Sequence, residues 1–363
     1  MRVAIVTLHR VYNYGSVLQA YATQKVFEKR GHDTKIIDYL TPQRTKWRLF
    51  WGKGAEGQSN VIYRIAKIGS FILKEKTFGR FVRTRINLTK RYVTADDLQR
   101  DPPEADLYVT GSDQTWNSQY NEGIDRGFFL DFLPDTARRI AFVSSFGKTE
   151  LDKGEIEETK RLLRRYEKIS VREDSAVKII TDMGLEAPTH LIDPTLMLEK
   201  SEWLKISSPR LVKEPYLVLM LLYNEDNHAT EYARKIADKK GLKLVKISWE
   251  MKKPLRVDQL FTHRSPADFL SLFYYADFVV TNSFHGLAFS LNLEKQFIMV
   301  PRNEFNSRIE SLLRLVSQSN RLVTSEENAL DESEKEIDYK VIKERFSAER
   351  QRTYEFLDSI EGL

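Results

Sequence analysis

The sequence contains no cysteine, which excludes disulfide bonds, thiolate metal sites and cysteine nucleophiles. It also contains no apolar run near the ~20 residues that a membrane-spanning helix needs. The N-terminus lacks the apolar core and cleavage site of a signal peptide, so we expect a cytoplasmic protein. His, Asp and Glu do not cluster at ligand spacing, and the first glycine-containing loop is not a GxGxxG fingerprint. We therefore expect no metal, and the sequence gives little support for a nicotinamide or flavin cofactor.

Hydrophobic residues make up 41% and charged residues 30% of 363 residues, as in a soluble globular protein of two domains. The net charge of +5 is unevenly spread. The segment 42–91 holds 13 of the 57 Lys and Arg residues but 2 of the 52 Asp and Glu, a local net of +11. Aromatic residues such as Trp47, Phe50 and Trp51 lie among these charges. Such a segment suits an anionic membrane surface, although a nucleic acid or packing on its own domain would share the composition; we predict the membrane and no nucleic acid.

Apolar runs and helical patterns alternate along the chain. A strand at 2–8, a helix after residue 16 and a strand at 34–39 form a βαβ unit, which implies a parallel sheet. The same rhythm restarts at Tyr216. We predict an α/β fold with two Rossmann-like domains that face a central cleft. The domains are 1–205, with a basic-aromatic insertion at 42–91, and 206–330; a charged helix at 337–363 could cross back to the first domain.

Several predicted strands of the first half end in small polar residues. Carboxyl ends of parallel strands share one edge of a sheet, where α/β proteins bind ligands, so we expect one cleft built from several loops. Ser145, at the end of one of these strands, is a candidate donor-binding residue. The candidate acceptor or cleft residues are Asn13, Tyr14, Gly15, Ser16, Gln19, Gly111, Ser112, Asp113, Gln114, Trp116 and Asn117.

The stretch 276–300 predicts a strand, a tight turn and a helix. Asn282, Ser283 and Gly286 lie at the turn, where hydroxyl groups and helix N–H groups would suit an anion. His285 is set among them and is the best candidate for proton transfer near neutral pH. A histidine that merely caps the helix is the alternative.

Seven segments together resemble the polysaccharide pyruvyl transferase family. They are NYGSVLQAYA (13–22), GSDQTWN (111–117), SSFG (144–147), SVRE (170–173), DPTLML (193–198), ADFVVTNSFHGLAFS (276–290) and NSRI (306–309). The resemblance implies a fold similar to the GT-B glycosyltransferases, with phosphoenolpyruvate as donor and a sugar hydroxyl pair as acceptor. The product would be a pyruvate ketal on a cell-surface polysaccharide precursor, formed on a lipid-linked sugar.

The resemblance also implies roles for single residues. His285 matches the functional histidine of the family, and Arg172 matches an arginine expected to contact the donor. Several members carry an arginine where this chain has Ser283, so the donor anions must be met by Arg308, Arg172 or Arg10. Two other functions stay open: a GT-B glycosyltransferase that uses a nucleotide sugar, and a non-enzymatic glycan-binding protein.

Overall fold

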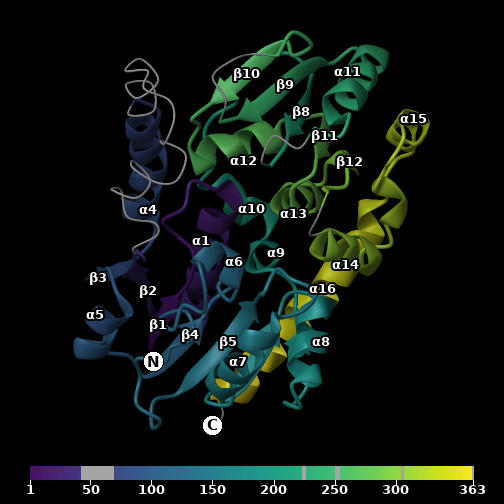
Figure 1. The fold of residues 1–363 in the computed structure, drawn as a ribbon. Coiled ribbons are helices and arrows are strands. Elements are labelled where there is room, and N and C mark those ends of the chain that lie inside the picture. Colours follow the sequence, from purple (N-terminus) through teal and green to yellow (C-terminus); the bar gives the residue numbers. More distant parts are fainter. Residues whose placement is uncertain (42–68, 223–225, 250–253, 304–305, 362–363) are drawn as a thin grey trace, which may run out of the picture. The chain divides into compact units, whose positions relative to one another are not determined.

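The computed structural model describes residues 1–41, 69–222, 226–249, 254–303 and 306–361. Contacts divide the chain into two compact units (Figure 1). Unit 1 comprises Met1–Met197 and Thr353–Leu363, and unit 2 comprises Leu198–Arg352. The boundary falls before Leu198 and not after residue 205, because Trp203 of the short helix α10 (Lys200–Leu204) is fully buried and its ring lies 5.0 Å from that of Phe289 in unit 2. No helix among the described residues is long and apolar enough to cross a membrane.

Unit 1 is built on a seven-stranded, wholly parallel sheet in the order β3-β2-β1-β4-β5-β6-β7. Every residue of β4 and β5 is buried, as expected where helices cover both faces of a parallel sheet. The strands are β1 (Arg2–Val6), β2 (Asp33–Tyr39), β3 (Leu88–Tyr92), β4 (Leu107–Thr110), β5 (Arg139–Ser144), β6 (Lys168–Val171) and β7 (Thr189–His190). The helices are α1 (Tyr14–Lys29), α4 (Arg80–Arg85), α5 (Ala95–Arg100), α6 (Ser118–Asn121), α7 (Ile156–Leu163), α8 (Asp174–Asp182) and α9 (Pro194–Met197), with a π-helical turn η2 (Glu75–Gly79) and a 3-10 turn η3 (Lys153–Glu155).

The predicted insertion at 42–91 is in part an integral element of unit 1. Its last residues form β3, which pairs with β2 at the edge of the sheet. Phe78 and Phe81 are buried, and the ring of Tyr12 meets Phe78 edge-on at 6.0 Å. The described part therefore packs on its own unit. Residues 42–68, which include all three aromatic residues at 47–51, lie outside the described residues.

Unit 2 has a five-stranded parallel sheet in the order β10-β9-β8-β11-β12. Alternate residues of neighbouring strands share one apolar cluster with α11: Leu217 and Leu219 lie in register with Phe278 and Val280. This period of two arises because successive side chains of a strand point to opposite faces of the sheet. The elements are β8 (Tyr216–Met220), α11 (Ala229–Lys240), β9 (Lys243–Ser248), β10 (Gln259–Thr262), α12 (Pro266–Tyr274), β11 (Phe278–Thr281), α13 (Phe284–Asn292), β12 (Gln296–Met299), α14 (Ser307–Leu315), η4 (Ser319–Arg321) and α15 (Glu326–Glu334).

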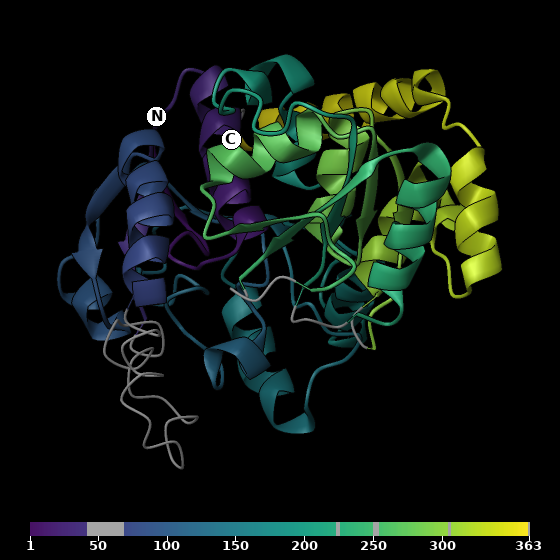
Figure 2. The ribbon, with the colours of Figure 1, turned by 90° about the horizontal axis from the view of Figure 1, so that it is seen from above.

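The last helix, α16 (Tyr339–Glu361), is one continuous helix (Figure 2). Contacts assign it to unit 2 up to Arg352 and to unit 1 from Thr353. Near its C-terminal end the Arg138 side chain donates a hydrogen bond to the carbonyl of Ile360 (2.8 Å), and Asp358 forms an ion pair with Arg30. These contacts attach the final residues to unit 1.

Candidate active site

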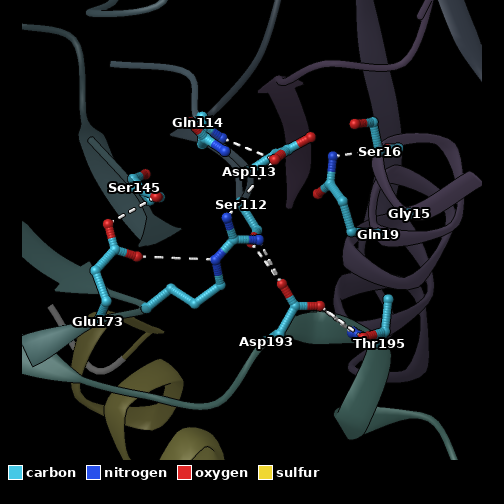
Figure 3. Close-up of polar contacts among 12 residues, drawn as sticks. Gly15, Ser16, Gln19, Ser112, Asp113, Gln114, Ser145, Glu173, Asp193 and Thr195 are labelled. Carbon is cyan, nitrogen blue, oxygen red and sulfur yellow. Dashed lines mark hydrogen bonds and ion pairs between the residues drawn. The ribbon is translucent and has the colours of Figure 1, made fainter. Parts of the chain in front are cut away.

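Arg172 is the centre of a buried charge cluster at the carboxyl edge of the unit 1 sheet. It follows β6, and its guanidinium lies 2.8 Å from Asp193, 3.6 Å from Asp113 and 3.8 Å from Glu173 (Figure 3). Asp193 follows β7, Asp113 follows β4, and Glu173 is the next residue after Arg172. One cation therefore ties together three segments that are far apart in the sequence.

The cluster carries more negative than positive groups. Burial opposes the charge on Arg172, but attraction to Asp193, Asp113 and Glu173 outweighs burial and raises the pKa of Arg172. The three carboxylates also use other donors: Thr195 donates to Asp193 from its backbone N–H (2.9 Å) and its hydroxyl (2.7 Å). Arg172 is thus held by protein groups, and a direct contact with a donor substrate stays a prediction.

Ser145 is a hydrogen-bond donor to Glu173. Its hydroxyl donates to Glu173 Oε1 at 2.7 Å, and the N–H of Gly147 is shared between that oxygen and Ser145 Oγ. Gly147 has a φ of +63°, and a Cβ there would lie 2.1 Å from Gln114 Oε1. Only glycine fits this turn without displacing Gln114. The sequence motif at 170–173 contains Glu173 as well as Arg172, and only the arginine is predicted from the sequence to be a site residue.

The loop after β4 also turns its polar groups toward the protein. Ser112 donates to Asp193 at 3.2 Å, and a Cβ on Gly111 would meet β1 and Thr7 at 3.1 Å. Asn117 is the N-cap of α6, since its side chain accepts from the N–H groups of residues 119 and 120. Its amide also donates to Gln114 at 2.8 Å.

Trp116 does not line a cleft, contrary to the prediction from the sequence. It is 3% exposed and stacks on Phe129 with ring centroids 5.5 Å apart and an interplanar angle of 14°. Phe146 and Tyr166 complete an aromatic cluster around it. In a sequence, an indole next to polar loop residues suggests a ring on which a sugar stacks. Here the apolar surface of the ring is buried in the core.

The loop after β1 is braced in the same way. Asn13 caps α1 and accepts from the N–H groups of Gly15 (2.9 Å) and Ser16 (3.4 Å). The buried amide of Gln19 donates to the Thr7 hydroxyl and the Ser16 carbonyl, both at 2.9 Å. Tyr14 is buried, with its ring 5.1 Å from that of Phe78. These residues shape the loop, and Figure 3 shows Ser16 and Gln19 beside the cluster that contains Asp113.

In unit 2, the turn from β11 to α13 is built by its own polar side chains. Ser283 is the N-cap of α13 and accepts from the N–H of Gly286 at 3.2 Å. Capping is therefore the work of Ser283 and not of His285. Asn282 accepts from the N–H of Leu222 at 2.7 Å, which ties the ends of β8 and β11. A Cβ on Gly286 would lie 2.4 Å from Thr281 Oγ1, so this glycine permits close packing of the helix on the strand end.

His285 and Arg308 both approach the ring of Phe284. His285 is the second residue of α13 and is 6% exposed, and its ring centroid lies 5.2 Å from that of Phe284. Arg308, in the first turn of α14, places its guanidinium carbon 5.7 Å from the centroid of the same ring. An imidazole in the first turn of α13 and a guanidinium in the first turn of α14 thus approach the same aromatic ring. That set can hold an anion and transfer a proton.

The sequence that contains these motifs matches the model of a known protein family. The family model described as polysaccharide pyruvyl transferase matches residues 13–304. The chain belongs to this family. Membership confirms the resemblance seen in the motifs and makes the protein a transferase enzyme of polysaccharide biosynthesis. The match includes the Arg172 cluster and His285, whereas Arg10 and Arg308 lie outside it.

Solved structures give the pyruvyl transferase family member its fold class. UDP-GlcNAc 2-epimerase from Methanocaldococcus jannaschii has a TM-score of 0.50 at 13% identity, with 92% of each chain covered. A putative UDP-N-acetylglucosamine 2-epimerase from Listeria monocytogenes also has a TM-score of 0.50, at 10% identity, with 96% of this chain and 90% of that chain covered. A mutant O-GlcNAc transferase from Thermobaculum terrenum has a TM-score of 0.45 at 12% identity; the match covers 99% of this chain and spans 64% of that longer chain.

The two likenesses with a TM-score of 0.50 and the two parallel sheets confirm the predicted class of two Rossmann-like α/β domains, the class of the GT-B enzymes. No protein of curated function is significantly similar in sequence.

Proposed function

We propose that this enzyme transfers the pyruvyl group of phosphoenolpyruvate to two hydroxyl groups of a sugar, forming a cyclic pyruvate ketal on a polysaccharide precursor. The observation that carries the proposal is that His285, in the first turn of α13, and Arg308 both approach the ring of Phe284. Phosphoenolpyruvate carries a carboxylate and a phosphate, and guanidinium forks and helix N-termini are the groups that bind such anions.

The chemistry requires two proton movements. The methylene carbon of the donor gains a proton, and each sugar hydroxyl loses one as its oxygen bonds to the central carbon of the pyruvyl group. The phosphate leaves with its bridging oxygen and accounts for the second proton. We assign one of these transfers to His285, a role that contributes typically 10²- to 10⁴-fold to rate. Arg308 would bind a donor anion in place of the arginine that this chain lacks at position 283.

A lipid-linked acceptor at an anionic membrane completes the proposal. The helical stretch 69–85 supports it, because Ile72 is 57% and Leu73 44% exposed and Lys76, Arg80 and Arg83 are exposed as well. Apolar and basic groups together are typical of a helix that rests on anionic lipid. The test is co-sedimentation with anionic and neutral vesicles at low and high salt, with Lys76, Arg80 and Arg83 changed to Glu as the comparison. Equal binding to both lipids would contradict this part.

The transfer itself is tested by incubating the purified protein with phosphoenolpyruvate and a panel of galactosides, free and lipid-linked. Release of phosphate that depends on the acceptor, with a ketal methyl signal in the NMR spectrum of the product, is the expected result. Parallel incubations contain nucleotide sugars instead of phosphoenolpyruvate. Turnover only with nucleotide sugars would replace the proposal by a glycosyltransferase, and glycan binding without turnover would replace it by a binding protein.

A further inference from the structure

A small cavity lies in unit 1 beside the carboxyl ends of β1 and β2, at the sheet positions away from Arg172. His9, Arg10, Tyr12, Phe78 and Arg91 are among the residues that line it. Its volume is about 40 Å³, counted over the positions that the centre of a water molecule can take. One water needs about 10–15 Å³ on that scale, so the cavity suits a group of a few atoms, such as a phosphate.

Asp38 binds the two arginine side chains that line this cavity, Arg10 and Arg91. Arg10 binds both carboxylate oxygens, through Nε at 2.5 Å and Nη2 at 2.8 Å. Arg91, opposite Asp38 in the β2–β3 register, binds through Nε at 3.2 Å. Asp38 is 4% exposed; burial raises its pKa, but hydrogen bonds from His9 and Arg10 outweigh burial and hold the pKa well below its usual range. The carboxylate is therefore ionised and fixes the two guanidinium groups.

His9 also contacts this carboxylate. Its Nδ1 lies 3.0 Å from the carbonyl oxygen of Thr7, and its Nε2 lies 3.2 Å from Asp38 Oδ1. Carbonyl and carboxylate oxygens only accept hydrogen bonds, so both contacts are hydrogen bonds when both ring nitrogens carry protons. Two guanidinium groups and one imidazole therefore face one carboxylate. Glu75 also lines the cavity, but it already accepts from Tyr12 (3.3 Å) and pairs with Arg83 (3.4 Å).

Arg10 and Arg91 have guanidinium nitrogens that their bonds to Asp38 do not use. Arg10 uses Nε and Nη2 for Asp38, and Arg91 uses only Nε; within the described residues, no hydrogen bond is made by Arg10 Nη1 or by either terminal nitrogen of Arg91. Planar guanidinium forks match phosphate oxygens, and bonds between the two are charge-assisted. The cavity therefore has an excess of both positive charge and donors.

We propose that this cavity binds the phosphate of a phosphorylated sugar, that is, the phosphate through which the acceptor is linked to its carrier. The inference rests on the proposed function, which places the donor anions at Arg308 and leaves this second site to the acceptor. The rings of Tyr12 and Phe78, which meet edge-on beside the cations, favour a ligand with an apolar sugar face over free phosphate.

The experiment is calorimetric titration of the whole protein with galactose 1-phosphate, galactose, inorganic phosphate and phosphoenolpyruvate. The variant is Arg91→Gln, chosen because its side chain is 47% exposed and makes one bond to Asp38, so the fold should survive. The matched control is Arg80→Gln, an exposed arginine of α4 that does not line the cavity. We expect galactose 1-phosphate to bind more tightly than phosphate, and its affinity to fall about tenfold or more in Arg91→Gln and less than about twofold in the control.

The outcomes separate this inference from the proposed function. Equal affinity in Arg91→Gln and wild type, or no binding of galactose 1-phosphate by wild type at about 10 mM, would overturn the inference. A loss confined to phosphoenolpyruvate would assign the cavity to the donor and also overturn it. If Arg91→Gln weakens galactose 1-phosphate binding while no acceptor supports phosphate release, the phosphate site stands and the transferase proposal fails.

Discussion

Replacement of Arg172 by Met should destabilise unit 1 severely. The Arg172 side chain is 1% exposed, and its guanidinium lies 2.8, 3.6 and 3.8 Å from three buried carboxylates. Loss of one partner of a buried ion pair costs about 3–5 kcal/mol, because the remaining charge is left without compensation. For a unit of this size that corresponds to a fall in Tm of roughly 6–20 °C.

The assay is thermal unfolding by calorimetry and circular dichroism, with Arg161→Met as the matched control. Arg161 also binds two carboxylates, Glu158 at 2.9 Å and Asp131 at 3.2 Å, but its side chain is 49% exposed. Surface pairs contribute about 0–1 kcal/mol, so the control should lose no more than ~4 °C. The double variant Arg172→Met/Asp193→Asn should unfold at a higher temperature than Arg172→Met, because it buries one charge fewer. Equal Tm losses in Arg172→Met and Arg161→Met would refute the reasoning.

Three further predictions concern unit 2. His285→Ala should lower kcat for pyruvyl transfer about 10²- to 10⁴-fold with Tm changed by less than about 2 °C, and a wild-type kcat would disprove the proton-transfer role. Arg308→Lys should raise KM for phosphoenolpyruvate more than it lowers kcat, because the planar fork is lost while the charge stays; an unchanged KM would remove Arg308 from the donor site. Burial, with help from Lys200, lowers the pKa of Lys295 to about 8, so wild-type stability should rise with pH between about 8 and 10.5, where the unfolded chain binds the proton that the folded one has lost. Lys295→Met should be more stable than wild type by a margin that is largest below pH 8 and shrinks toward pH 10.5 in pH-dependent denaturant unfolding, and a constant margin would contradict the shift.

The strands of both sheets were largely predictable from the sequence. Buried parallel strands appear as continuous apolar runs, and the run at 278–280 lies within β11. The edge strand β3 was not predictable in the same way. Its three central residues, 89–91, are polar and Tyr92 alone is buried, so the strand resembles the basic segment that precedes it. An edge strand buries too little surface to leave an apolar signal.

The partners of Arg172 could not be predicted either. Asp113 and Asp193 are 80 residues apart in the sequence, and they approach the same guanidinium because β4, β5, β6 and β7 are consecutive in the sheet. Strand order was not part of the sequence evidence. Glu173, by contrast, adjoins Arg172, so an acid next to an arginine was visible in the motif at 170–173, and the structure shows that this acid is fully buried.

Polar residues at strand ends have two possible tasks, and a sequence does not separate them. Turns leave backbone N–H and C=O groups that must be paired when buried, and Asn13, Gln19 and Asn117 each pair such groups. The same residue types bind ligands. Once these internal bonds are known, the carboxyl edge of the unit 1 sheet shows a reversal of charge. Near β4 and β6 one arginine faces three carboxylates, and near β1 and β2 one carboxylate faces two arginines and a histidine. A bound anion is repelled at the first position and attracted at the second, so the edge itself favours the β1–β2 end for a phosphate.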